Sequence, residues 1–414
     1  MRQLPWLRTL VAYGLAQSAF ALSAFIKVPL IIGAGGNAAY AAVTLIISAW
    51  AITAALADGL GQTSRVMLAE RGIGQSERVR RLVGGAASGE ALVMMLVAVV
   101  GFVVLLAIGH STELWLLYFG FAIVCLPVSY AKGILEASDR TALSNATLAT
   151  NVVVSLPLVA LAAYFSGGEV WLCAATLGGV AAPFAVFAYL VRTPGLRIFY
   201  RPRTTRQTMS TVFSTTVYSF ANVMAYAFDP IIIAAFMTSR EVSAFGLASR
   251  IMTLAMLLPL ALGGLISTQI NSWRGQTAPG DSYRRVRRLC LQLGAAGAIV
   301  SALAVAIGPV IGQWLGRGVI ETPFTLYLAF GAYAVVSSAT APIFALFSGP
   351  GVAHFRAIVA MVAGIANLGL SALLIHPFGV AGPVVASLIC LVAMVVMLLA
   401  KTRHGMDAIM MIHG

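Results

Sequence analysis

Three ionisable residues lie inside long apolar stretches of this chain: Lys27, Asp229 and Arg250. A charged side chain inside a bilayer costs at least about 2.5 kcal/mol on insertion scales, so such a residue should line a polar cavity or meet a partner. All three are predicted to lie about 9–13 Å below the outer membrane surface. We therefore expect them to face one central space, as candidate substrate-binding residues.

Structural roles for the same residues stay open. Asp229 and Arg250 can form an ion pair that only fixes the packing of two helices, and Asp229 can simply neutralise one of the two cations. Lys27 can extend its ammonium to the outer interface. Asp58 lies near the inner end of its apolar stretch, where pairing with neighbouring arginines is the simpler interpretation. If Asp58 faces the cavity instead, it is the best candidate for binding a coupling cation or proton at an inner gate.

Pro29 follows Lys27 after one residue, and Pro230 follows Asp229 directly. A proline removes one backbone hydrogen bond, so each is expected to kink its helix. The kink is either a static bend or part of a gate at the outer mouth.

Two loops carry the same sequence, Arg-Val-Arg-Arg-Leu, at 78–82 and 285–289. Their arginines are interpreted as contacts to anionic lipid heads or as an inner entrance for a phosphorylated head group. The entrance arginines are Arg78, Arg80, Arg81, Arg285, Arg287 and Arg288.

Composition indicates which elements must position these residues. Apolar residues make up 60% of the 414 and charged residues only 9%, far below the roughly 25% of a soluble domain. We predict an all-α integral membrane protein with about twelve transmembrane helices, since each apolar stretch is long enough for a spanning helix and no alternating strand pattern is present. The predicted spans are 9–33, 38–60, 83–109, 114–135, 142–166, 170–191, 208–237, 242–270, 289–316, 323–348, 355–376 and 379–400.

The basic residues predict the orientation. Of 26 Lys and Arg residues, 22 lie at the chain ends or in the loops that follow every second predicted span, on the same side as the chain ends. The loops on the opposite side contain only Arg240 and Arg317, and Lys27 and Arg250 lie within spans. Basic loops stay on the cytoplasmic side, so both termini are predicted to be cytoplasmic. The net charge of +13 is explained by this topology and calls for no nucleic-acid partner.

The two halves of the chain resemble each other. Residues 27–32 match 228–233, the two Arg-Val-Arg-Arg-Leu segments match, and Asn-x-x-x-Ser occurs at 151–155 and 367–371. Six spans per half bring both halves into the membrane from the same side, as parallel repeats typical of transporters. We predict an N-terminal lobe over 1–200 and a C-terminal lobe over 201–414 around a central cavity, with alternating access by rocking of one half against the other.

Several short motifs are spread over both halves of the chain. They are Val-Pro-Leu-Ile-Ile at 28–32, Ala-Asp-Gly-Leu-Gly at 57–61, Phe-Asp-Pro-Ile-Ile-Ile at 228–233, residues 241–250, Asn-Leu-Gly-Leu-Ser at 367–371 and residues 377–382. Through these motifs the chain resembles the bacterial oligosaccharide flippases of the polysaccharide-exporter branch of the multidrug/oligosaccharidyl-lipid/polysaccharide exporter superfamily. The resemblance covers most of the chain through diffuse patterns of small residues. The few deep basic residues, and the lack of two further C-terminal spans, argue against a lipid II flippase.

The resemblance implies that the protein is not an enzyme but a transporter of the bacterial cytoplasmic (inner) membrane. Its implied substrate is an undecaprenyl-diphosphate-linked oligosaccharide that moves from the cytoplasmic to the outer leaflet, with the diphosphate bound by Lys27 and Arg250. Implied partners are membrane lipids and, for polysaccharide assembly, a polymerase and assembly proteins. No cofactor or metal is expected, apart from a coupling H⁺ or Na⁺.

Three other functions agree less well with these residues. A drug–cation antiporter of the same superfamily needs net negative charge in its cavity, whereas the three deep residues sum to a positive charge. A membrane-embedded polymerase or glycosyltransferase usually carries a large external loop with catalytic residues, and the outer loop near Arg317 is too small. A major-facilitator carrier needs a basic Asp-Arg-x-Gly-Arg-Arg type loop after its second span, which this chain lacks.

Overall fold

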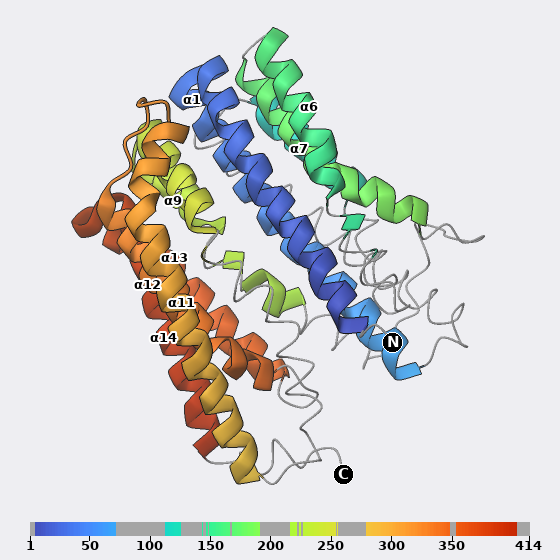
Figure 1. Cartoon of the computed structure of the whole chain (residues 1–414), viewed down its shortest axis with the longest axis vertical. Coiled ribbons are helices and arrows are strands. Elements are labelled where there is room, and N and C mark those ends of the chain that lie inside the picture. Colours follow the sequence, from blue (N-terminus) through green and yellow to red (C-terminus); the bar gives the residue numbers. More distant parts are fainter. Residues whose placement is uncertain are drawn as a thin grey trace. The chain divides into compact units, whose positions relative to one another are not determined.

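The computed structural model describes residues 5–71, 112–125, 143, 146–147, 149–165, 168–190, 216–221, 223–224, 227–253, 255, 279–347 and 353–403. Within these residues every regular element is a helix (Figure 1). The named elements are α1 (Pro5–Arg71), α3 (Thr112–Cys125), α6 (Thr150–Phe165), α7 (Glu169–Leu190), α9 (Asp229–Phe236), α11 (Pro279–Leu315), α12 (Phe324–Leu346), α13 (Ala353–Phe378), the 3₁₀ turn η3 (Gly379–Ala381) and α14 (Gly382–Arg403). A further helix covers 239–253.

Four stretches of the described residues are long and apolar enough to cross a membrane: Leu22–Ile52, Arg284–Leu315, Phe324–Leu346 and His354–Lys401. Two of them contain a break between two helical segments. Gly36 has φ 66° and ψ −156° in the middle of α1, a backbone conformation open to glycine but strained for other residues. The η3 turn separates α13 from α14 in the same way. These lengths and compositions are those of an integral membrane protein.

Most described helices coincide with predicted spans to within a few residues. The predicted span 323–348 contains a run of small and hydroxyl residues, yet α12 is continuous through it. Its hydroxyls bond to carbonyls of the preceding turn: Ser338 Oγ donates to Ala334 O at 2.7 Å, and Thr340 Oγ1 to Val336 O at 2.8 Å. These bonds satisfy the hydroxyl groups without a break in the helix. The predicted span 83–109 lies outside the described residues.

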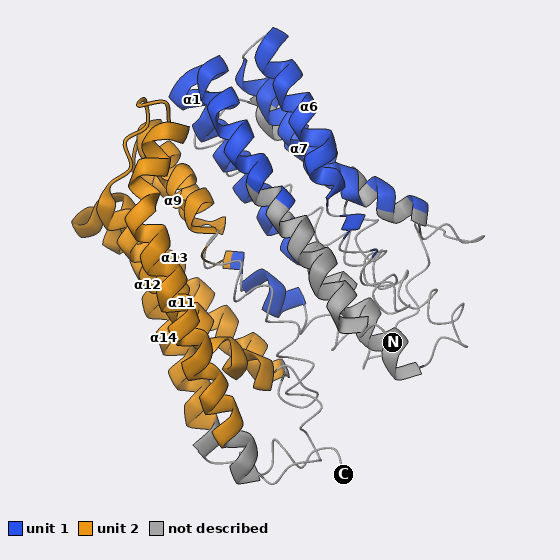
Figure 2. Ribbon diagram, viewed as in Figure 1, with its two compact units in different colours: residues 1–223 blue, residues 224–414 orange. Residues whose placement is uncertain are grey.

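The chain divides into two compact units, residues 1–223 and 224–414 (Figure 2). In unit 1, α1 packs against α6 and α7, α6 packs against α7, and α3 contacts α7. In unit 2, α11 pairs with α12 and α13 with α14, while α9 packs against α13 and α14. Each unit thus builds its own helical core. The predicted division between residues 200 and 201 lies outside the described residues.

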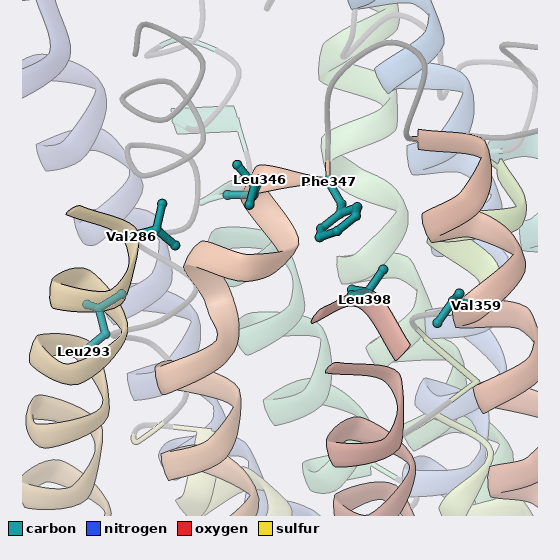
Figure 3. Close-up of a cluster of buried hydrophobic side chains, with 7 residues drawn as sticks. Val286, Leu293, Leu346, Phe347, Val359 and Leu398 are labelled. Atoms are coloured by element: carbon teal, nitrogen blue, oxygen red, sulfur yellow. The ribbon is translucent and has the colours of Figure 1, made fainter. Parts of the chain in front are cut away.

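One apolar cluster joins the four long helices of unit 2 at one end (Figure 3). It lies at the start of α11, the end of α12, the start of α13 and the end of α14. Phe347 is completely buried in it. The cluster consists of Val286, Leu293, Ala345, Leu346, Phe347, Val359 and Leu398. Because it unites four helix ends, it fixes the relative register of α11, α12, α13 and α14.

Candidate functional site

In unit 1 the deep cation is held by a polar pair on α6. The Lys27 ammonium donates a hydrogen bond to Ser155 Oγ at 2.9 Å, and Ser155 Oγ in turn donates to Asn151 Oδ1 at 3.3 Å. Ser155 is completely buried and Asn151 nearly so, whereas Lys27 is half-buried. The ammonium therefore has a defined partner, on a side chain that is only partly buried.

A close helix contact places this serine. A Cβ at Gly179 of α7 would lie 2.0 Å from the Ser155 Cβ and 2.7 Å from its Cα. Only a residue without a side chain permits this approach of α7 to α6. Gly179 thus sets the distance between the two helices, and through Ser155 it positions the Lys27 ammonium.

In unit 2 the deep carboxylate is almost fully enclosed. Asp229, 2% exposed, is the first residue of α9, and the chain bends at Phe228 just before it. The Ser387 hydroxyl of α14 hydrogen-bonds the Asp229 carboxyl, whereas Oδ1 of that carboxyl has no partner among the described residues. Pro230 occupies the first turn of α9, where its missing N–H leaves no broken bond in that helix.

Arg250 lies on the helix over 239–253 and is half-buried. Within the described residues no ion pair joins it to Asp229, which bonds Ser387, so the alternative of a purely structural pair is not realised.

The three deep residues lie at different distances from the nearest helix end or break. Lys27 is nine residues from the break at Gly36, Asp229 is seven from the end of α9, and Arg250 is eleven from the helix start at 239. The prediction that all three lie at one depth below the outer membrane surface stays a prediction.

The other candidate residues have different settings. Pro29 lies inside the first segment of α1, whereas Pro230 starts a helix, so the two matching prolines differ in their local structure. Asp58 lies on the second segment of α1.

Three of the predicted entrance arginines are exposed on α11, which begins ten residues before the predicted span: Arg285, Arg287 and Arg288. The matching Arg78, Arg80 and Arg81 lie outside the described residues.

Sequence reasoning found the deep charges but missed their partners. Ser155 and Ser387 had no predicted role, although the repeated Asn-x-x-x-Ser motif contains Ser155. In unit 2 this motif provides Asn367 and Ser371, both completely buried on α13. A signal was available, because residues four apart lie on one helix face and the motif occurs once in each half of the repeat.

Solved structures share this fold over nearly the whole chain. An inward-facing multidrug resistance MATE family transporter of the MOP superfamily matches with a TM-score of 0.67 and 15% identity, over 95% of this chain and 96% of that one. An outward-facing MATE family transporter of the same superfamily matches with a TM-score of 0.65 and 15% identity, over 99% and 97%. The fold is therefore that of the MATE transporters of the MOP superfamily.

A MOP superfamily transporter from Pyrococcus furiosus matches with a TM-score of 0.62 and 15% identity, over 98% of this chain and 96% of that one. Its structure is described as having a binding pocket of reverse polarity that suggests a different function. No protein-family model and no curated protein matches the chain.

Proposed function

We propose that this protein is an alternating-access transporter that flips a polyprenyl-diphosphate-linked oligosaccharide from the cytoplasmic to the outer leaflet of the bacterial cytoplasmic membrane. In this proposal twelve spans form two lobes of six, with both termini in the cytoplasm. Alternating access is supported by the fold, which occurs in transporters with inward-facing and outward-facing structures. The substrate is inferred from charge.

The observation that carries the proposal is that the two deep cations, Lys27 and Arg250, are half-buried, whereas Asp229 is enclosed. A diphosphate is an anion that must cross a low-dielectric interior, so it requires cations at membrane depth. An ammonium has three donors, so Lys27 can bond a phosphate oxygen as well as Ser155. Arg250 can hold a phosphate by two parallel hydrogen bonds.

A drug–cation antiporter is the second candidate, because the solved structures that share the fold include multidrug resistance transporters. A cationic drug requires an accessible carboxylate. Asp229 is 2% exposed, whereas Lys27 and Arg250 are half-buried, so the accessible charge among these three residues is positive. The reverse pocket polarity described for the Pyrococcus furiosus transporter is a precedent for a different pocket charge on this fold.

The test is transport by the purified, full-length protein in proteoliposomes. A fluorescent polyprenyl-diphosphate oligosaccharide starts in one leaflet, and its appearance in the other is measured with a membrane-impermeant quencher. Lys27→Met and Arg250→Met should each lower the flipping rate about tenfold or more, because each removes a charge-assisted hydrogen bond worth about 1.5–3 kcal/mol. Arg317→Ala, a change in an exposed turn, should leave the rate unchanged.

Melting temperatures of all variants separate misfolding from loss of transport. Flipping that survives both methionine substitutions would contradict the cationic mechanism. Efflux of cationic dyes without any lipid flipping would establish the antiporter instead.

A further inference from the structure

One face of α11 is exposed and apolar over most of the helix. Its large exposed side chains recur at intervals of three, four or eight residues, which places them on one face. They are Leu291, Ile299, Leu303, Ile307, Val310 and Trp314, each 43–72% exposed. An apolar face of this kind suits lipid chains rather than a polar cavity, and a tryptophan at its end is typical of the membrane interface.

The same face continues into arginines at the other end of the helix. Arg284 and Arg288 stand seven and three residues before Leu291, and both are exposed. Because α11 is one continuous helix from Pro279, they lie on the same face as Leu291. Arg288 and Trp314 are 26 residues apart, about 39 Å along a helix, against a hydrocarbon core of about 30 Å. Both ends of the face therefore reach the layer of phospholipid head groups.

The start of α11 is strongly basic. Its first ten residues contain four arginines and one acidic residue, Asp281, a net charge of +3. Val286 is buried in the apolar cluster of unit 2 (Figure 3), whereas its neighbours Arg285 and Arg287 are exposed. Packing at Val286 thus turns the arginines on either side of it outward. Between residues 282 and 401 the only acidic residue is Glu321, which lies beyond the opposite end of α11.

Two further cations are held at this end of unit 2, on α13 and α14. The Arg356 guanidinium donates from Nη1 to the Phe344 carbonyl oxygen at 3.3 Å. The Lys401 ammonium lies 5.3 Å from the centre of the Phe355 ring. Phe344 and Phe355 both pack against the apolar cluster that includes Val286. Basic side chains of three helices therefore gather at one end of unit 2.

We propose that this end of unit 2 binds an anionic phospholipid, with its head group on Arg287 and Arg288 and its acyl chains along the α11 face from Leu291 onward. Arginine holds a phosphate by parallel hydrogen bonds. A zwitterionic lipid carries its own ammonium group, so a basic surface favours a lipid with net negative charge, such as phosphatidylglycerol. In the orientation that the basic residues predict, the lipid belongs to the cytoplasmic leaflet.

The test uses the full-length protein purified in detergent, with phosphatidylglycerol compared against phosphatidylcholine of the same acyl chains. Phosphatidylglycerol should raise the melting temperature by several degrees more, because a ligand that binds only the folded state stabilises it. Native mass spectrometry should detect more phosphatidylglycerol than phosphatidylcholine bound to the protein. Arg287→Ala combined with Arg288→Ala should remove at least half of both differences. Arg287→Lys combined with Arg288→Lys keeps the charge and should retain most of them.

Arg317→Ala is the matched control, because Arg317 is an exposed arginine in the turn after the opposite end of α11. It should keep the full preference for phosphatidylglycerol. An equal response to the two lipids, or a preference that persists in the double alanine variant, would overturn the site. So would an equal loss in Arg317→Ala. If the double alanine variant does not fold, Arg287→Gln and Arg288→Gln decide in its place, and each should lower the preference.

Two other ligands distinguish the sources of phosphate. Glycerol 3-phosphate has the phosphate without acyl chains, so it should not stabilise the protein at the same concentration, and an equal effect would mean a site for soluble phosphate instead. A polyprenyl diphosphate that stabilises the protein through these arginines, where phosphatidylglycerol does not, would make the surface an entrance for the transported lipid. Either result would overturn the phospholipid site.

The phospholipid site does not depend on the transported substrate. A preference for phosphatidylglycerol that requires the two arginines would stand even if the protein moved cationic drugs. Lipid flipping that requires Lys27 and Arg250, without that preference, would support the proposed function and refute the phospholipid site.

Discussion

Thr238 and Glu241 form a reciprocal cap at the start of the helix over 239–253. The Thr238 backbone N–H donates to Glu241 Oε2 at 3.1 Å, the Thr238 hydroxyl donates to the same oxygen, and the Arg240 N–H donates to Thr238 Oγ1 at 3.3 Å. This is close to the capping-box pattern, in which side chains satisfy helix N–H groups that have no partner within the helix. The hydrogen bond from the Thr238 hydroxyl, chiefly, lowers the pKa of Glu241 below its ordinary value.

This cap predicts a pH-dependent contribution to stability. Because the folded-state pKa of Glu241 is lowered, its stabilisation is fully present above the ordinary glutamate pKa of about 4.3 and is lost as the pH falls through the folded-state pKa. Glu241→Ala should lower the free energy of unfolding by about 1 kcal/mol or less at pH 7, and by a smaller amount at about pH 3. Thermal unfolding in detergent at the two pH values measures the difference.

The control for this prediction is Glu321→Ala. Glu321 pairs with Arg240 at 2.6 Å, but the two side chains are 80% and 58% exposed, so solvent screens the pair and its loss should change little. If Glu241→Ala lowers the free energy of unfolding by the same amount at both pH values, the ionised carboxylate is not what stabilises the cap.

Residue chemistry explains why the deep charges were predicted and their partners were not. Lys27 and Asp229 stand out because neighbouring residues are apolar for many positions on either side. Ser155 and Ser387 do not, because a serine in a spanning helix commonly bonds its own preceding turn, as Ser338 does here. Which serine meets a charge depends on which helices pack together, and that is a property of tertiary structure.

At the scale of elements, glycine contacts determine how closely the helices approach. Gly179 lies against backbone and side-chain atoms of Ser155, and the Leu374 backbone lies against Gly382. Backbone atoms cannot rotate away as the end of a flexible side chain can. We therefore expect these two positions to tolerate even a methyl group poorly.

Gly179→Ala tests this at the contact that positions Lys27. The added Cβ would lie 2.0 Å from the Ser155 Cβ, so α7 must move away from α6. Overpacking of this kind costs about 1–3 kcal/mol, so we expect a clear fall in melting temperature together with slower transport. Fluorescence-detected size exclusion after heating measures the first effect, and the proteoliposome flipping assay measures the second.

Gly369→Ala is the matched helical control, because a Cβ at this exposed position of α13 meets nothing within 4 Å. It should be neutral or stabilise by up to about 1 kcal/mol, since alanine favours the helix over glycine. Equal losses in the two variants would show that the close contact between Gly179 and Ser155 is not the cause of the loss.

Helix positions followed from hydropathy, whereas helix ends and breaks did not. The described spans agree with the apolar stretches because the hydrocarbon thickness dictates their length. Hydropathy does not show that α11 continues for ten residues through the polar segment before Leu289, or that the chain bends at Phe228 before α9. These details depend on backbone hydrogen bonding and on the position of each proline. Pro230 stands in the first turn of α9, whereas Pro29 lies inside the first segment of α1.

At the scale of the whole molecule, the internal repeat relates the two units. The first segment of each half packs against the helix that carries its Asn-x-x-x-Ser motif: α1 against α6 in unit 1, and α9 against α13 in unit 2. The repeat was predicted from short matches in sequence, and the matching contacts in the two units give it a structural meaning. The two copies differ in charge, with Lys27 in one and Asp229 in the other, so similar helix pairs hold two chemically different sites.

Orientation in the membrane is the remaining prediction. The segment from Arg284 to Leu315 is 32 residues long, about 48 Å as a helix and sufficient to cross a hydrocarbon core of about 30 Å. Its two ends are therefore expected on opposite sides. The basic end at Arg285 is expected in the cytoplasm and the exposed turn at Arg317 outside, since an excess of arginine marks the cytoplasmic side.

Cysteine labelling in intact cells tests this orientation. The four native cysteines are first replaced by alanine, and Arg317→Cys and Arg285→Cys are then introduced one at a time. A membrane-impermeant maleimide should label the cysteine at 317 in intact cells and the cysteine at 285 only after the cells are permeabilised. Transport by both variants confirms that they fold. The reverse labelling pattern would place both termini outside, and labelling at both positions in intact cells would mean that α11 does not cross the membrane.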